Sequence, residues 1–295
     1  MIDFSIIIPH KNSPELLIRC LKSIPKRKDV QIIVVDDNSD EKIDLKAIPD
    51  FADSNISIIY TTEGKGAGYA RNIGLKYAKG NWLFFADADD YFNESLNWAL
   101  DFYKNSDADI IYFNVNSVDS ETLQVHNRAH FLNEYHQRKD EMMFRFKTYY
   151  PWAKMIKQKL IIEHEINFSE TKAANDVLFS LKTGLYANKI ELCREKIYCI
   201  TYRENSLEHI KGDMDIYKAR IFISIETNKF YEKNNIPFKD DLYYRYLLRI
   251  LTIDFKTFII TIKECHQQGL PYTTMIYLMT KRVFNNLMQK CLKKY

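Results

Sequence analysis

Residues 1–115 alternate short apolar runs with segments of helical periodicity. Runs rich in β-branched and aromatic residues predict strands at Phe4–Ile8, Gln31–Val35, Ile56–Tyr60, Trp82–Ala86 and Asp109–Phe113. Helical patterns at 14–24 and 69–78 lie between some of these runs, and Pro14 and Gly80 mark a helix start and a helix end. Near-continuous apolar strands separated by helices are typical of a parallel sheet covered on both faces. The pattern therefore predicts an α/β domain with a doubly wound, mainly parallel sheet.

The remainder of the chain changes character near residue 210. Residues 116–205 are mixed, with a helical pattern at Asp176–Gly184 and a β-rich run at Ile197–Arg203. After Asp213, apolar residues recur at helical spacing almost throughout. We therefore expect a first domain over residues 1–210, with halves at about 1–115 and 116–210, and a helical C-terminal region over 211–295.

Composition favours a reducing compartment. The 5 cysteines are odd in number and form no C-x-x-C pair, which argues against a disulfide framework and against a zinc site. The apolar run at Phe4–Pro9 is too short for a signal peptide, and no run of about 18 apolar residues could span a bilayer. We expect a cytoplasmic protein.

Polar side chains follow three of the predicted strands. They are His10–Asn12, Asp36–Ser39 and the acidic segment Asp87–Asp90. In open parallel sheets ligands bind at the carboxyl ends of the strands, so these residues are candidates for one site. The carboxylates of Asp87, Asp89 and Asp90 would repel one another unless a cation neutralised them, and oxygen ligands suit Mg²⁺ or Mn²⁺. The alternative is a solvated acidic turn that precedes a helix near Asn93.

Six short segments, in this order and spacing, carry a resemblance to a known family. They are Ser5–Pro9 with Asn12, Val34–Ser39, Gly66–Leu75, Phe84–Asp90, Trp152–Lys154 and Asn175–Phe179. Together they make the chain resemble a family 2 glycosyltransferase with the GT-A fold, of the inverting, bacterial surface-polysaccharide type. The resemblance covers about residues 3–205 and leaves the C-terminal region outside it.

The resemblance implies a donor site for a UDP-sugar. Asp37 would accept a hydrogen bond from the uracil imide with Asp36 in support, and Pro9 would shape the uridine pocket. The alternatives for these residues are a turn that ends a strand and a simple strand stop. The donor site would be completed by the residues of the acidic segment and the arginine that braces them: Arg71, Asp87, Ala88 and Asp89.

A divalent cation, Mn²⁺ or Mg²⁺, would be the cofactor of this site. By the same resemblance Asp89 would be its direct ligand, and Asp87 would hold the ribose or a metal-bound water. Asp90 would orient the loop. Arg71 could instead be a surface arginine of a helix.

On the acceptor side, the resemblance makes Asp176 the general base that takes the proton of the attacking hydroxyl. Asn175 stands where the family usually has Glu, and Asp176 could instead be a helix N-terminal residue that favours the macrodipole. Trp152 and Lys154 match an aromatic and basic pair near the acceptor and diphosphate, although Trp152 could belong to the core. His209 would lie in a loop near the active site and could contact metal or phosphate.

The two predicted regions differ in net charge. Residues 211–295 contain 15 Lys+Arg and 8 Asp+Glu, whereas residues 1–210 contain 27 and 31. The basic helical region would either dock on an anionic membrane surface, where a lipid-linked acceptor lies, or mediate a homodimer. No recognised module accompanies the basic residues, so we expect no nucleic-acid partner.

These observations favour an inverting, metal-dependent hexosyltransferase. It would move a sugar from a UDP-sugar to a hydroxyl of a glycan or lipid-linked oligosaccharide, in the biosynthesis of lipopolysaccharide, capsule or a similar polymer. The alternative is a degenerate subunit that binds nucleotide-sugar without transferring it. A dinucleotide-dependent oxidoreductase is disfavoured because no G-x-G-x-x-G follows the first strand.

Overall fold

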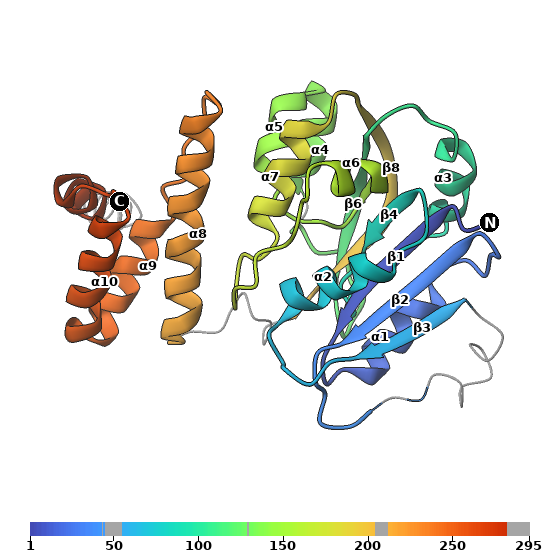
Figure 1. Cartoon of the computed structure of the whole chain (residues 1–295), viewed down its shortest axis with the longest axis horizontal. Helices are drawn as coiled ribbons and strands as arrows, with labels where there is room; N and C mark the ends of the chain where they lie inside the picture. The colour runs from blue at the N-terminus through green and yellow to red at the C-terminus, as the bar shows by residue number, and fades with distance from the viewer. Residues whose placement is uncertain (43, 45–54, 129, 204–211, 282–295) are drawn as a thin grey trace. The chain divides into compact units, whose positions relative to one another are not determined.

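The computed structural model in Figure 1 describes residues 1–42, 44, 55–128, 130–203 and 212–281 of the 295-residue chain. The chain divides into two compact units. The first comprises Met1–Thr171 and Asn175–Ser206, and the second comprises Lys172–Ala174 and Leu207–Tyr295. Each unit is described by itself below.

The first unit is built on a mixed sheet that has 8 strands among the described residues, in the order β3-β2-β1-β4-β7-β6-β8-β5. Its parallel core comprises β1 (Phe4–His10), β2 (Val30–Asp36), β3 (Ile56–Tyr60) and β4 (Trp82–Phe85). The second half contains β5 (Tyr91–Phe92), β6 (Ile110–Asp119), β7 (Lys154–Lys157) and β8 (Ile190–Tyr202). The predicted strands of the parallel core are confirmed to within two residues at each end.

The second half of the sheet differs from the sequence prediction. The strand predicted at Asp109–Phe113 continues to Asp119, because it pairs in parallel with β8 along its whole length, with a register shift around Asn114. The short strand β7 was not predicted; it lies antiparallel between β4 and β6. Pairing of this kind depends on distant segments and carries little local signal.

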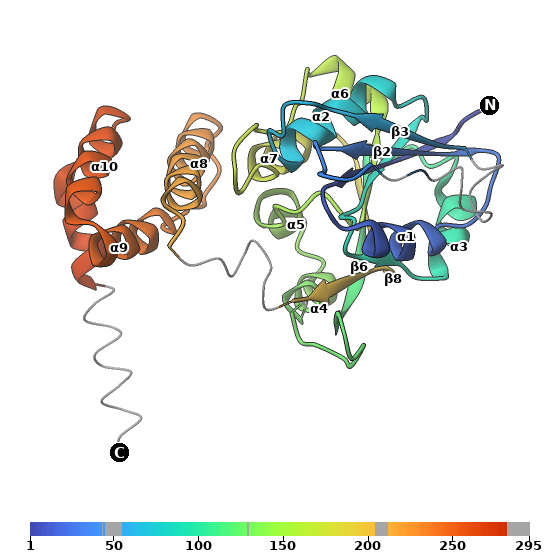
Figure 2. The same cartoon turned by 90° about the horizontal axis from the view of Figure 1, so that it is seen from below.

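Helices cover both faces of this sheet. Figure 2 shows α1 (Pro14–Lys22) and α3 (Ser95–Tyr103) on one face and α2 (Ala67–Tyr77) on the other. Four further helices follow in the second half of the unit: α4 (His130–Arg138), α5 (Glu141–Lys147), α6 (Gln158–Glu163) and α7 (Val177–Tyr186). β1 and β4 are buried along their whole lengths because they are central strands with helices on both faces, which explains their continuous apolar sequences.

The second unit is helical in its described part. It contains α8 (Met214–Lys233), α9 (Tyr243–Ile253) and α10 (Phe255–Gln267), around a core that includes Ile221, Leu247 and Met275. Asp213 caps α8 and Asp254 caps α10, each through backbone N–H groups of the first turn. Within the described ranges, no helix combines the length and apolar character that crossing a bilayer requires.

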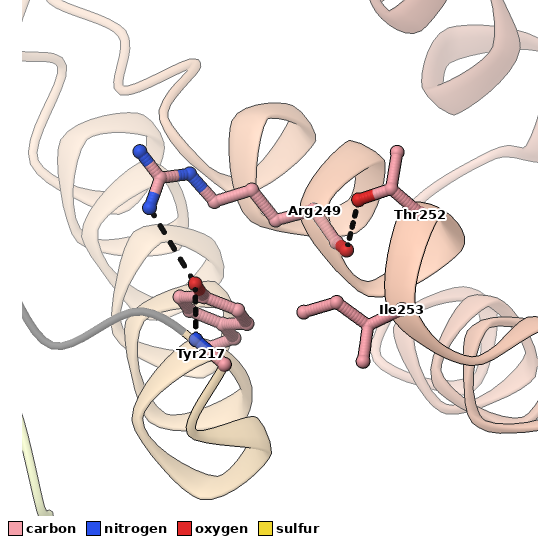
Figure 3. Close-up of a pocket in the computed structure, with 5 residues that line it drawn as sticks. Tyr217, Arg249, Thr252 and Ile253 are labelled. Atoms are coloured by element: carbon pink, nitrogen blue, oxygen red, sulfur yellow. Dashed lines mark hydrogen bonds between the residues drawn. The ribbon is translucent and has the colours of Figure 1, made fainter.

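A pocket of about 380 Å³ opens in the second unit (Figure 3). Its lining is Gly212, Tyr217, Arg249, Thr252 and Ile253. The Tyr217 hydroxyl accepts a hydrogen bond from the Gly212 amide at 2.9 Å, and Arg249 Nη1 lies 3.5 Å from it. No residue that the sequence assigned to a donor or acceptor site lines this pocket.

Candidate active site

The acidic and polar residues that follow β1, β2 and β4 lie at one edge of the sheet. His10 at the end of β1 is in register with Asp36 at the end of β2, and Ile7 of β1 is opposite Phe85, the last residue of β4. Parallel strands end at a common edge, so the prediction that these segments share one edge is confirmed. Pro9, predicted to shape the nucleoside pocket, is buried and in register with Val35.

Asp36 and Asp37 do more than end a strand. Asp36 forms a buried contact of 2.8 Å with His10 Nδ1 and accepts a hydrogen bond from the Ser39 amide. Asp37 accepts a hydrogen bond from the Gly66 amide at 2.7 Å and is only 3% exposed. Gly66 immediately precedes α2 with a φ of 95°, a conformation that favours glycine. Asp37 thus ties the end of β2 to the start of α2.

Asp87, Asp89 and Asp90 form an acidic cluster just after β4. One carboxylate oxygen from each lies within 4.8 Å of the others. Burial and the charge of Asp89 raise the pKa of Asp87, which Arg71 opposes. The pKa of Asp90 lies well above its ordinary value because the side chain is buried beside two like charges. Ala88, between them, is 7% exposed.

Strand β8 holds the far side of the acidic cluster. The Tyr198 hydroxyl donates a hydrogen bond to Asp90 at 3.0 Å and accepts one from the Asp87 amide at 2.9 Å. The Thr201 amide donates to Asp90 at 2.7 Å. Asp90 therefore faces the protein, whereas Asp87 and Asp89 are partly exposed.

The cluster suits a hard divalent cation. Its donors are carboxylate oxygens. The pKa values of Asp87 and Asp90 are raised first by burial and also by neighbouring carboxylates, and a cation would relieve the repulsion among these charges. The guanidinium of Arg203 already pairs with the Asp89 carboxylate, so a positive charge has access to this carboxylate. The sequence places Arg203 at the end of a β-rich run and carries no signal for this ion pair.

Arg71 joins the acidic cluster to the acceptor side. Its guanidinium contacts Asp87 at 2.5 Å and donates to the Asn175 side chain at 2.8 Å. Arg71 is only 5% exposed, so the alternative of a surface arginine is wrong. Helix α2 approaches the 169–175 segment closely: a Cβ on Gly68 would lie 2.1 Å from the Ser169 carbonyl oxygen and 2.9 Å from Asn175 Cβ. Glycine at 68 therefore permits the approach.

Asp176 follows Asn175 and stands at the N-cap position of α7, yet its side chain makes no capping hydrogen bond. Burial raises its pKa to about 6, Asp87 adds to the rise, and Arg71 opposes it. Among the described residues, the Asp176 carboxylate therefore neither caps the helix nor forms a single ion pair. A carboxylate with a pKa near 6 suits a general base at neutral pH.

Trp152 and Lys154 lie in different surroundings. Trp152 is half-buried and stacks on Tyr150 with ring centroids 3.7 Å apart, and it lies parallel to Tyr198 at 5.7 Å. Lys154 is 1% exposed, and its ammonium donates to the Thr148 carbonyl at 2.8 Å. Burial lowers the pKa of Lys154 to about 7, while Asp176 acts to raise it. Trp152 belongs to an aromatic wall beside the acidic cluster, whereas the ammonium of Lys154 lies in the interior.

The two histidines that the sequence analysis names have different outcomes. His209 lies outside the described residues. His10, which the sequence analysis includes among the polar residues after the first strand, is the buried partner of Asp36. The apolar run before His10 and the polar residues after it carry no signal for that particular contact.

Comparison with known proteins identifies the family. The model of glycosyl transferase family 2 matches residues 5–164, which is more than half of the chain. The chain belongs to glycosyl transferase family 2, and its first unit has the GT-A fold.

Two relatives are named as glycosyltransferases of poly(ribitol-phosphate). The chain is 27% identical over 239 residues to the poly(ribitol-phosphate) beta-N-acetylglucosaminyltransferase TarS of Staphylococcus aureus, covering 77% of this chain and 40% of TarS. It is 29% identical over 202 residues to a poly(ribitol-phosphate) beta-glucosyltransferase of Bacillus spizizenii, covering 66% and 31%. The chain therefore spans less than half the length of these relatives.

A solved structure shares the fold. The S. aureus TarS fragment 1-349 in complex with UDP-GlcNAc matches with a TM-score of 0.61 and 24% identity, over 86% of this chain and 74% of the fragment.

Proposed function

We propose that the protein is an inverting, divalent metal-dependent glycosyltransferase. It transfers a hexose-type sugar from a UDP-sugar to a hydroxyl of a glycan or lipid-linked oligosaccharide in bacterial surface-polysaccharide biosynthesis. The observation that carries the proposal is the position of Arg71, which contacts both Asp87 of the acidic cluster and Asn175 next to Asp176. One side chain thereby links a cation and diphosphate site to a candidate general base.

The donor nucleoside would lie at the ends of β1 and β2. Asp37 is an acceptor-only group at this edge and retains lone pairs beyond the one used by Gly66, as an imide N–H requires. Asp36, fixed by His10, holds the turn that carries Asp37, and Pro9 forms the neighbouring wall. The TarS fragment that shares this fold carries UDP-GlcNAc, which supports UDP as the nucleotide.

Asp89 and Asp87 would hold the cation, with Asp90 and Ala88 positioning the segment between β4 and β5. A bound Mn²⁺ or Mg²⁺ supplies Lewis-acid stabilisation of the charge that develops on the leaving diphosphate. The protein's own part is to keep Asp87 oriented through Arg71 and Asp90 oriented through β8.

Asp176 accepts the proton of the acceptor hydroxyl as that oxygen attacks the anomeric carbon. In the same displacement the bond from the anomeric carbon to the diphosphate oxygen breaks, UDP leaves, and the configuration inverts. With a pKa of about 6, Asp176 is mostly ionised at neutral pH and still basic enough to accept a proton. The β linkages in the names of the two poly(ribitol-phosphate) relatives agree with inversion from an α-linked donor.

The acceptor sugar would stack on the aromatic wall of Trp152 and Tyr150. Asn175 fixes the approach of Asp176 through its bond from Arg71. Lys154 would serve the acceptor side indirectly, because its buried charge favours the ionised form of Asp176.

We further propose a cytoplasmic location with peripheral contact of the second unit to the anionic inner face of the membrane. Phe255, Ile276 and Tyr277 of this unit are 65%, 58% and 61% exposed, which suits an interfacial apolar face. Binding to vesicles with and without anionic lipid tests this placement, and size measurement in solution tests the homodimer alternative.

A donor panel tests the transferase function. UDP-sugars are incubated with the protein, Mn²⁺ and candidate acceptors; UDP release and the anomeric configuration of the product are measured, with Asp176→Asn as the control. We expect the wild-type protein to give a product of inverted configuration from one of the UDP-sugars. The Asp176→Asn variant should bind the same UDP-sugar without transferring its sugar. UDP binding without transfer of any donor would favour the degenerate subunit, and absence of UDP binding would overturn the donor assignment.

A further inference from the structure

The three carboxylates of the acidic cluster have three different kinds of partner. Asp87 pairs with Arg71, which is fixed from its other side by Asn175. Asp90 accepts hydrogen bonds from β8 and is buried. Asp89 pairs with the guanidinium of Arg203, which follows the last residue of β8. Of the three partners, Arg203 is the one that contacts the predicted direct metal ligand.

The Asp89–Arg203 pair is open to exchange. The side chains of Arg203 and Asp89 are 39% and 29% exposed, compared with 6% for Arg71. Arg203 Nε is buried and makes no hydrogen bond among the described residues, so the guanidinium is held chiefly through its contact with Asp89. An exposed ion pair of this kind contributes little stability, so it can be broken at small cost.

The position of Asp89 does not depend on Arg203. The Asp89 carbonyl accepts hydrogen bonds from Arg19 Nη2 at 2.5 Å and from the Thr201 hydroxyl at 2.7 Å. The neighbouring Asp90 is anchored to the Thr201 amide. Removing the Arg203 side chain should therefore leave the Asp89 carboxylate in place and change only its counter-charge.

We propose that Arg203 is the resident counter-cation of Asp89 and that a divalent metal must displace it. The guanidinium and the metal compete for the same carboxylate oxygens and repel each other. A diphosphate offers the displaced guanidinium another anion, to which its planar donors are matched. Arg203 thus opposes metal binding to the empty protein and couples metal binding to donor binding. This inference rests on the proposed donor site.

Thermodynamic reciprocity makes the coupling measurable from either ligand. If Arg203 links the two, UDP raises the affinity for Mn²⁺ by the same factor by which Mn²⁺ raises the affinity for UDP. Loss of the guanidinium should then strengthen Mn²⁺ binding without nucleotide and reduce this factor. A merely structural role for Arg203 would weaken both ligands and would not strengthen either.

The test is direct Mn²⁺ titration of the full chain, followed by the electron paramagnetic resonance signal of free Mn²⁺, with and without UDP. We expect Arg203→Gln to tighten Mn²⁺ binding without UDP by about tenfold and to reduce the UDP-dependent gain by a similar factor, within the usual range of coupling between sites. Arg203→Lys, which keeps a charge, should stay close to the wild type. Arg194→Gln, on the exposed part of β8, is the control for a change in net charge.

Two further results complete the test. The effect of Arg203→Gln on Mn²⁺ affinity should vanish in an Asp89→Asn background, because the competition is for that carboxylate. Unchanged or weaker Mn²⁺ binding in Arg203→Gln, with normal coupling in the wild type, would overturn the inference and leave the proposed function standing. Failure of the wild type to bind Mn²⁺ and UDP together would overturn both.

Discussion

The proposed donor side and the proposed acceptor side of the site are held in different ways. On the donor side, Asp36, Asp37 and the acidic cluster follow adjacent parallel strands, and backbone amides and buried side chains fix them. On the acceptor side, Asp176 is placed by the approach of the 169–175 segment to α2, and its carboxylate makes no capping bond.

This difference has an electrostatic counterpart. The acidic cluster gathers three carboxyl groups whose pKa values, for Asp87 and Asp90, are raised by burial and by their neighbours, which suits the binding of a cation. Asp176 is a single carboxylate whose pKa is balanced between burial and Arg71. In the proposed function, the donor side would therefore bind a cation, and the acceptor side would exchange one proton.

The largest effect should come from Asp176→Asn. The change preserves shape and removes the base, so transfer should fall on the order of 10³-fold. Binding of UDP with Mn²⁺ should stay within about twofold, because Asp176 takes no part in holding the nucleotide. Steady-state kinetics and calorimetric titration check the two expectations. If UDP binding fell as much as transfer, Asp176 would contribute to nucleotide binding as well, and the donor and acceptor sides would not be distinct.

Asp89→Asn should produce the complementary result. With the proposed direct ligand neutralised, we expect transfer to fall about 10²-fold and UDP binding to lose its dependence on Mn²⁺. Titration of UDP at several Mn²⁺ concentrations measures this dependence. Retention of the wild-type metal dependence would place the cation elsewhere.

The two sides also differ in how far the sequence predicts them. The donor side follows from local patterns, because apolar runs that end in Asp36–Asp37 and Asp87–Asp90 place these residues at strand ends once the strands are parallel. Strand β7, the extension of β6 to Asp119 and the antiparallel pairings depend on partners distant in sequence.

Side-chain partners were less predictable than positions. The sequence places His10 and Asp36, 26 residues apart, at one edge of the sheet but does not indicate the bond between them. Nothing near Arg203 indicates its contact with Asp89, 114 residues away. Lys154 was expected at the acceptor and diphosphate, yet its ammonium is buried against Thr148, since a β-strand alternates faces and residue 154 faces the interior.

Arg71→Met should affect both sides at once. Arg71 lowers the pKa of Asp176, so its removal should move the acid limb of the kcat/KM profile from about pH 6 to higher pH. Asp87 and Asn175 would also lose the side chain that orients them, so the rate should fall by about tenfold. Arg71→Lys is the matched control and should shift the limb less. If the acid limb did not move in Arg71→Met, the group that titrates there would not be Asp176.

Stability should depend on pH in the direction set by the raised carboxyl pKa values. The pKa values of Asp176, Asp87 and Asp90 are higher in the folded protein than in an unfolded chain. Their protonated forms therefore favour folding at low pH, and this contribution is lost as pH rises through the folded values. The metal-free protein should melt about 5 °C lower at pH 8 than near pH 5.5. Mn²⁺ should reverse the loss at pH 8, as scanning calorimetry can show; a higher melting temperature at pH 8 without metal would contradict this account.

The smallest effect should come from Lys154→Met. The change leaves the Thr148 carbonyl without its donor but also removes a buried charge, so the free energy of unfolding should change by about 1 kcal/mol or less. The donor KM should stay within about twofold, because the ammonium lies in the interior. A large rise in donor KM, measured beside Lys157→Met as a second lysine-to-methionine change in β7, would instead place Lys154 against the diphosphate.

The most direct measurement is a crystal structure of the protein with UDP and Mn²⁺, with the metal located by its anomalous scattering. We predict one metal peak within coordination distance of the Asp89 carboxylate and of the diphosphate, the uracil imide against Asp37, and Arg203 moved away from Asp89. A metal peak away from the acidic cluster, or a uridine away from the ends of β1 and β2, would contradict the account.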